Sequence, residues 1–151
     1  SILPSAKKKV KLQIWDTAGQ ERYMALNKNL FQKVQGIILM YDLTNRESFE
    51  NLNSWLNLVT QNVSNKTIML VGNKLDLAEE KRIVTENEGR KVAEDNKILF
   101  SEASGASGEN VDKIFTDLSE KIYSSIMEEK KDKNDNFVIS NDKKKGKKGC
   151  C

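Results

Sequence analysis

The chain has 151 residues, 38% of them hydrophobic and 31% charged, which fits one globular domain and leaves little room for a second. The longest apolar run, Ile37–Tyr41, is far shorter than the ~20 residues that a membrane-spanning helix needs. Histidine is absent and the two cysteines are adjacent, which excludes imidazole chemistry and a disulfide-stapled fold and favours a reducing, cytosolic setting.

The net charge of +3 is unevenly distributed. From Lys130 to the end, eight lysines and three aspartates give +5, so the preceding residues carry about −2. Residues 130–151 are poor in apolar side chains and are expected to form a disordered tail. We therefore predict one domain over residues 1–129 and a cationic tail over residues 130–151 that meets an anionic surface, either a membrane or a nucleic acid.

Four segments have the patterns of strands. Lys9–Trp15 alternates between polar and apolar residues, which predicts a strand with one buried face. Gly36–Tyr41 and Thr67–Val71 are continuous apolar runs, as expected for strands buried on both faces of a parallel sheet. Ile98–Phe100 is a weaker run of the same kind.

Two candidate capping boxes mark the starts of helices between these strands. The tetrapeptide Thr44–Glu47 precedes an apolar stripe with helical spacing over Phe49–Val59. The tetrapeptide Thr85–Glu88 has the same Thr-x-x-Glu form and predicts a short helix that ends near Asn96.

The longest amphipathic stripe covers Val111–Ile126, and Asn110 is its candidate N-cap. Glu21–Val34 is expected to be loop and irregular helix. Strands that alternate with helices in this way predict an α/β fold with a parallel sheet.

The segment Trp15–Glu21 follows the first strand candidate and reads Trp-Asp-Thr-Ala-Gly-Gln-Glu. Ligands of parallel α/β sheets bind beyond the carboxyl ends of strands. An aspartate there can hold Mg²⁺ through water, a glycine lets its backbone N–H approach a phosphate, and a glutamine can orient an attacking water. Asp-x-x-Gly alone is equally compatible with an ordinary turn.

Two further motifs follow the later strand candidates. In Asn73-Lys74-Leu75-Asp76, the carboxylate can accept two N–H bonds from guanine, a donor pair that adenine lacks on that edge. An ordinary polar turn is the alternative for this tetrapeptide taken alone. The segment Glu102–Ala106 offers backbone N–H groups to the guanine O6, although small residues after a strand usually form a simple loop.

Taken together and in this order, the three motifs resemble the third, fourth and fifth guanine-nucleotide motifs of Ras-superfamily GTPases. Lys11–Trp15, Leu39–Thr44 and the terminal Cys-Cys resemble the Rab-type small GTPases in particular. The resemblance covers residues 7–129 and the tail, and it implies a P-loop NTPase-like three-layer α/β sandwich with a mostly parallel sheet.

No Gly-x-x-x-x-Gly-Lys-Ser/Thr pattern occurs in the sequence. In the family this phosphate-binding loop precedes the position of Asp16. We therefore expect an N-terminally truncated small G domain that lacks the phosphate-binding loop, the first switch and the first two strands of the sheet.

The resemblance implies a role for each matching residue. Asp16 would hold Mg²⁺ through water, Gly19 would contact the γ-phosphate, and Gln20 would be the catalytic residue that positions the attacking water. Five residues would bind the guanine base: Asn73, Lys74, Asp76, Ser104 and Gly105.

The chain departs from the family at two places. The fifth motif usually has alanine and lysine where this chain has Gly105 and Ala106, so a lysine that packs on the base is lost. Leu30 and Phe31 stand where Rab proteins usually have a tyrosine pair, which puts the family's effector contacts in doubt.

The tail ends in Lys143–Lys148, a glycine, Cys150 and Cys151. In the family, such a Cys-Cys end is a lipidation site with a geranylgeranyl group on each cysteine. Two lipid chains, or one chain with a polybasic run, anchor a protein stably, whereas one chain alone binds marginally. Because no aromatic residue interleaves with these lysines, we expect membrane binding and no nucleic acid.

The implied function is a GTP-binding and GTP-hydrolysing switch in vesicle trafficking, with GTP or GDP and Mg²⁺ as cofactors. The protein would be a lipid-anchored monomer on the cytoplasmic face of intracellular membranes, cycling with the cytosol. Expected partners are an escort protein, a GDP-dissociation inhibitor, an exchange factor, a GTPase-activating protein and effectors. The alternative is a lipidated interaction module without nucleotide chemistry, and GTPase activity of this chain alone stays open.

Overall fold

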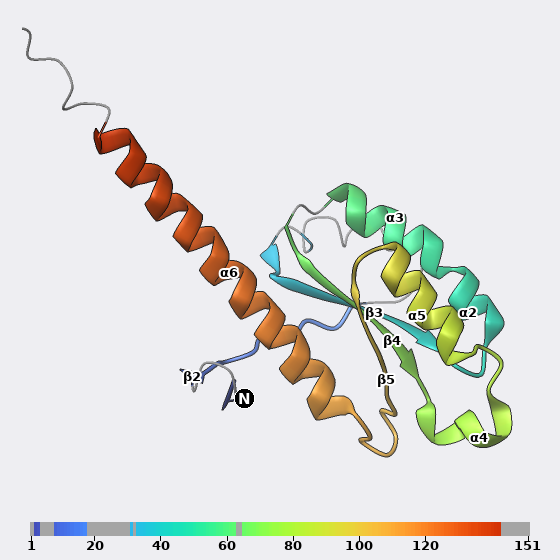
Figure 1. The fold of residues 1–151 in the computed structure, drawn as a ribbon. Coiled ribbons are helices and arrows are strands. Elements are labelled where there is room, and N and C mark those ends of the chain that lie inside the picture. Colours follow the sequence, from blue (N-terminus) through green and yellow to red (C-terminus); the bar gives the residue numbers. More distant parts are fainter. Residues whose placement is uncertain (1, 4–7, 18–30, 32, 63–64, 143–151) are drawn as a thin grey trace, which may run out of the picture.

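A three-stranded parallel sheet is the centre of the fold (Figure 1). The computed structural model describes residues 2–3, 8–17, 31, 33–62 and 65–142. The strands lie in the order β3–β4–β5 and comprise Gly36–Asp42, Thr67–Asn73 and Leu99–Glu102. These bounds confirm the strands predicted from the three apolar runs, with each strand extending further toward its carboxyl end.

The register brings the carboxyl ends of the three strands to one edge of the sheet. Asp42 pairs with Asn73, and Gly72 pairs with Glu102. Residues 68–72 of the central strand are buried, because helices cover both faces of the sheet. A parallel sheet requires such crossover helices, and its central strand is accordingly a continuous apolar run.

The helices form two layers around the sheet (Figure 1). Those on one face are α2 (Arg46–Glu50), α3 (Leu52–Asn62) and α5 (Glu86–Asp95), and α6 (Val111–Asp142) covers the other face. A short 3-10 turn, η2 (Leu75–Leu77), and α4 (Ala78–Lys81) follow β4. The result is the predicted three-layer α/β arrangement.

Each layer boundary has its own apolar core. Leu43, Val59, Leu70 and Val84 are fully buried between the sheet and the α2–α3–α5 layer. On the other face, residues of β4 pack against α6 in a smaller cluster that contains Met69, Val71, Ala103, Ile114 and Leu118. Fully burying such a side chain is worth about 1.5–3 kcal/mol, so these contacts supply the main stabilising term.

Tyr41 lies in the larger core in a crowded position. Its ring is 2% exposed and packs edge-to-face on Phe49, with 5.0 Å between the ring centroids. Burial raises the pKa of Tyr41, so the hydroxyl keeps its proton, yet it has no hydrogen-bond partner among the described residues. The backbones of Gly72 and Gly89 face this hydroxyl, and a Cβ atom at either position would lie within 3 Å of it.

The predicted strand Lys9–Trp15 is wrong. β2 comprises only Lys8–Lys9 and pairs with β1 (Ile2–Leu3) in a separate antiparallel ribbon. Residues 10–17 have no regular structure, and Ile14 and Trp15 are 67% and 59% exposed. Alternation predicts a face that can be buried, but a strand also needs a hydrogen-bonded neighbour, and no strand of the described part pairs with residues 10–17.

Helix starts are predicted in part. The capping box at Thr85 is confirmed, since Thr85 accepts from the Glu88 N–H while the Glu88 carboxylate accepts from the Thr85 N–H. The capping box predicted at Thr44 is wrong. Asn45 caps α2, and the Thr44 hydroxyl donates to Asp42 instead. Asn110 precedes α6 with a φ of +59° and donates its side-chain amide to the Glu102 carbonyl, so it does not cap the helix in the predicted way.

Helix α6 continues through Asp142, past the point where composition predicted the end of regular structure. Glycine and proline are both absent from residues 111–142, so no helix breaker interrupts it. Of the predicted irregular segment Glu21–Val34, only Phe31, Lys33 and Val34 lie within the described residues. Among the described residues, no helix combines the length and apolar character needed to cross a bilayer.

Candidate functional site at the carboxyl edge of the sheet

The loops that follow β4 and β5 are joined where the two strands end. The Leu75 N–H donates to the Ala103 carbonyl at 3.0 Å, and the Ala103 N–H donates to the Gly72 carbonyl at 2.9 Å. These two backbone bonds extend the pairing of β4 with β5 past the regular strand. They therefore place Asp76, which lies in η2, beside Ser104, which follows β5.

Ser104 holds the carboxylate of Asp76. The Ser104 side chain is fully buried, and its hydroxyl donates to Asp76 Oδ1 at 2.5 Å. Ser104 Oγ in turn accepts from the N–H groups of Ala106 and Ser107 at 3.2 and 3.0 Å. Asp76 itself is an exposed residue, while Ser104 fixes its Oδ1.

Asn73 ties three loops together. Its Oδ1 accepts from the Gly105 N–H at 3.1 Å, and its backbone carbonyl accepts from the Leu43 N–H at 3.0 Å. These contacts join the loops that follow β3, β4 and β5 at the edge where the resemblance implies a guanine site. The Gly105 N–H, which that resemblance aims at a base oxygen, is bonded to Asn73 here, so a base oxygen at this donor would compete with Asn73.

Lys74 reaches back to the end of β3. Its Nζ lies 2.6 Å from Asp42 Oδ2, and its φ of +70° puts the backbone in the left-handed region. Asp42 Oδ1 accepts from the N–H and the hydroxyl of Thr44 at 2.8 and 2.7 Å. Burial alone raises the pKa of Asp42, but the hydrogen bonds from Lys74 and Thr44 outweigh it and hold that pKa below its usual value.

A non-glycine residue in the left-handed region costs about 1–3 kcal/mol and persists only where neighbouring contacts fix it. The ion pair with Asp42 is such a contact for Lys74. Asp42 and Thr44 were not predicted as parts of this edge. Their position in the sequence could have indicated this, because Asp-Leu-Thr directly follows a buried strand, as the other two motifs do.

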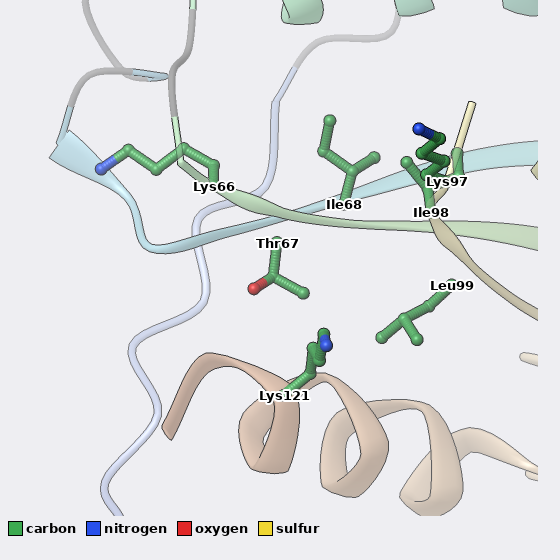
Figure 2. Close-up of a pocket in the computed structure, with 7 residues that line it drawn as sticks. All are labelled: Lys66, Thr67, Ile68, Lys97, Ile98, Leu99 and Lys121. Atoms are coloured by element: carbon green, nitrogen blue, oxygen red, sulfur yellow. The ribbon is translucent and has the colours of Figure 1, made fainter. Parts of the chain in front are cut away.

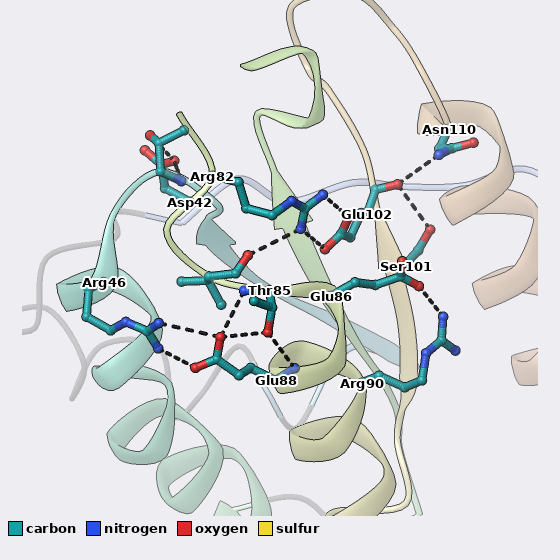
Figure 3. A network of polar contacts seen from close by, with 12 residues as sticks. Asp42, Arg46, Arg82, Thr85, Glu86, Glu88, Arg90, Ser101, Glu102 and Asn110 are labelled. Atoms are coloured by element: carbon teal, nitrogen blue, oxygen red, sulfur yellow. Dashed lines mark hydrogen bonds and ion pairs between the residues drawn. The ribbon is translucent and has the colours of Figure 1, made fainter. Parts of the chain in front are cut away.

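A network of ion pairs lies behind this edge (Figure 3). Arg82 and Glu102 form a bidentate pair, with Nη1–Oε1 at 2.7 Å and Nη2–Oε2 at 2.8 Å. Arg46 bonds Glu88 at 2.7 Å, and this contact, with those from Thr85, lowers the pKa of Glu88 to about 2. The first pair joins the residue after α4 to the end of β5, and the second joins α2 to the start of α5.

The remaining predicted site residues are not part of this cluster. Asp16 is exposed in the irregular segment 10–17, and among the described residues no hydrogen bond or ion pair joins it to the edge. Gly19, Gln20, Cys150 and Cys151 lie outside the described residues. Within the described ranges, no three acidic or cysteine side chains gather in a way that could hold a metal ion.

A cavity of about 290 Å³ lies at the opposite end of the sheet, against the amino-terminal ends of β4 and β5 (Figure 2). Three lysines are among its lining residues: Lys66, Lys97 and Lys121. Figure 2 shows Lys121 rising from α6 toward Thr67, whereas the amines of Lys66 and Lys97 extend away from it. The lysines do not converge, and this cavity is not part of the cluster around Asp76.

Comparison with known proteins identifies relatives of the whole chain. The profile of the Ras family matches residues 2–124. The chain is 37% identical over 145 residues to the Ras-related protein Rab-10 of Diplobatis ommata, covering 95% of this chain and 72% of that protein. It is 36% identical over 147 residues to Rab-10 of Caenorhabditis elegans, covering 95% and 73%. It is also similar to the Ras-related protein SEC4 of Candida albicans, with 42% identity over 128 residues that cover 84% and 60%.

Proposed function

This chain belongs to the Ras family, on its Rab branch. We propose that it is a GTP-hydrolysing switch in vesicle trafficking and that it recognises the guanine base through the cluster around Asp76. The observation that carries the proposal is the contact between Ser104 and Asp76. It holds a charged acceptor at the sheet edge where ligands of parallel α/β folds bind. Guanine presents two adjacent N–H donors that match such a carboxylate.

The other base contacts follow from the same cluster. Asn73 joins the loops on either side of the base, and the stem of Lys74 lies beside it with its amine held by Asp42. Ser104 contributes to the pocket by fixing Asp76, and the Gly105 N–H would serve a base oxygen in exchange for its bond to Asn73. We further propose that Asp16 holds Mg²⁺ through water and that Gly19 contacts the γ-phosphate, because they match the family motif.

Binding of fluorescent GDP and ADP analogues to the full-length protein tests the proposal. A site built to hydrogen-bond one partner rejects an analogue without the matching donors by about 10⁴–10⁵-fold, so GDP should bind far more tightly than ADP. Absence of binding would favour the alternative of a lipidated interaction module without nucleotide chemistry. Equal affinity for both nucleotides would contradict guanine recognition by the cluster around Asp76.

Gln20→Leu should slow intrinsic GTP hydrolysis by about tenfold or more, because it removes the group that orients the attacking water. Nucleotide affinity should stay at the parental value, since the role proposed for Gln20 is to orient water and not to bind the base. Single-turnover hydrolysis of preloaded GTP measures the first quantity, and GDP titration measures the second. Unchanged intrinsic hydrolysis would remove Gln20 from the catalytic role.

Replacing both Cys150 and Cys151 by serine should release the protein from membranes to the cytosolic fraction. Changing one of them should leave partial membrane binding, because one lipid chain anchors marginally and two anchor stably. Fractionation of cells that express each variant measures the distribution. A double variant that stays in the membrane fraction would place the anchor elsewhere in the protein.

The expected partners follow from a switch of this class. An exchange factor loads GTP, a GTPase-activating protein accelerates its hydrolysis, and effectors bind the GTP form. An escort protein presents the tail for lipidation, and a GDP-dissociation inhibitor extracts the lipidated protein. The proposed location is the cytoplasmic face of intracellular membranes, with a cytosolic pool.

A further inference from the structure

We propose that Arg82 is a positioning residue for guanine recognition, acting through its bidentate ion pair with Glu102. Neither residue is among those proposed to contact the base. Together they hold the loop that carries Asp76 against the loop that carries Ser104. The inference rests on the proposed function, because it concerns how precisely that same base site is built.

The segment between β4 and α5 is fastened to the end of β5 at two points, and Figure 3 shows the second of them, the Arg82–Glu102 pair. At its start, the Leu75 N–H donates to the Ala103 carbonyl at 3.0 Å. At its end, the Arg82 guanidinium meets both oxygens of Glu102, the residue directly before Ala103 in the chain, at 2.7 and 2.8 Å. Asp76 lies between these two points, so its backbone belongs to a loop that is closed at both ends.

The ion pair is better placed to fix this loop than the others in the network. The Arg82 and Glu102 side chains are 25% and 9% exposed, whereas those of Arg90 and Glu86 are 53% and 54% exposed. A bidentate guanidinium–carboxylate pair fixes orientation as well as distance, and shelter from solvent strengthens it. An exposed single pair contributes little.

Glu102 is also the fixed partner of the two. Its main chain is paired with Gly72 in the sheet, and its carbonyl accepts from the Asn110 side-chain amide at 2.9 Å. Arg82 directly follows the short helix α4, and its Nη1 makes one further bond, to the Val84 carbonyl at 3.2 Å. Loss of the Arg82 side chain should therefore free the loop that carries Asp76 and leave β5 in place.

Greater mobility of the loop that carries Asp76 should be measurable as a loss of selectivity for the guanine base. Guanine offers Asp76 two donors, whereas the base of inosine diphosphate lacks the 2-amino group and offers one. Ser104 fixes only one carboxylate oxygen, so the orientation of the other depends on the backbone of the loop. A mobile loop should weaken GDP binding more than IDP binding and reduce the preference for GDP.

The test compares dissociation rates of fluorescent GDP and IDP from full-length variants. Arg82→Met should speed GDP release about tenfold, the equivalent of one charged hydrogen bond, and should lower the GDP preference several-fold. Arg82→Lys, which keeps the charge but loses the fork, should fall in between. The exchanged pair Arg82→Glu with Glu102→Arg should restore both values. Arg90→Met, the matched control in an exposed ion pair, should match the parent.

A purely structural role predicts a different pattern. General weakening of the fold would speed release of both nucleotides equally and leave the GDP preference unchanged, and that result with Arg82→Met overturns the inference. If Arg82→Met does not fold, Arg82→Lys decides in the same way, and a parental preference overturns it. Asp76→Asn distinguishes the base site from the positioning role of Arg82. If Asp76→Asn loses the GDP preference while both Arg82 variants keep it, the base site stands and the positioning role of Arg82 is overturned. A parent without any GDP preference would overturn the proposed function as well.

Discussion

Asp76→Asn is expected to lower the affinity of the full-length protein for GDP by about 10²–10⁴-fold, because it converts a charged acceptor into a neutral one that takes a single base donor. Hydrogen bonds to charged groups are worth roughly 1.5–3 kcal/mol each, and two are affected. Xanthine presents a carbonyl where guanine has its 2-amino group. The asparagine amide should donate to that carbonyl, so xanthosine diphosphate should bind the variant more tightly than GDP.

Competition of GDP and xanthosine diphosphate against a fluorescent analogue measures both effects. The local structure should survive the change, because asparagine keeps an oxygen for the Ser104 hydroxyl at the position of Oδ1. A thermal melt close to that of the parent is therefore the control. A variant that binds GDP as tightly as its parent would remove Asp76 from the base site.

Gly89→Ala should destabilise the protein by about 3 kcal/mol, even though alanine favours a helix by ~1 kcal/mol over glycine in an exposed helix. The added Cβ would lie 2.3 Å from the Tyr41 hydroxyl and 2.7 Å from the ring of Phe100. Both neighbours are rigid rings packed in the core between the sheet and α5, so neither can move aside easily. Steric overlap therefore outweighs propensity.

Denaturant unfolding of Gly89→Ala should show a lower midpoint with an unchanged slope. Adding Tyr41→Phe removes the closer of the two overlaps and a buried hydroxyl without a described partner, so the double variant should recover at least about 0.5 kcal/mol relative to strict additivity. Gly105→Ala is the matched control, since its Cβ would meet only Asn73 Oδ1 at an ordinary 3.7 Å. A parental midpoint for Gly89→Ala would contradict the crowded packing around Tyr41.

The parts of the fold that depend on local pattern could be predicted from the sequence. A few consecutive residues are enough to predict the strands that begin at Gly36 and Thr67 and the helix start at Thr85. The approach of Asp76 to Ser104 could also be expected, because both follow strands whose carboxyl ends share one edge. In a parallel sheet, neighbouring strands then bring the residues that follow them close together.

The parts that depend on distant partners could not be predicted in this way. The alternation at Lys9–Trp15 describes a strand, but pairing decides whether one forms. The hydroxyl of Thr44 could cap a helix or bond Asp42, and only the geometry at the end of β3 decides between these. Arg82 and Glu102 are 20 residues apart with no local pattern that links them, so the ion pair is visible only in the folded chain.

Because β4 lies between two strands and between two helical layers, it should unfold locally less often than the strands beside it. Its amides at residues 68–72 are buried and flanked by paired strands on either side, so their hydrogens should exchange with deuterated solvent only when the whole domain unfolds. Leu99–Glu102 lies at the edge of the sheet and is only partly buried, so its amides should exchange through smaller, more frequent openings. The loop with Ser104, which follows β5, should therefore open more often than the core of β4, while the Arg82–Glu102 pair still joins it to the loop with Asp76.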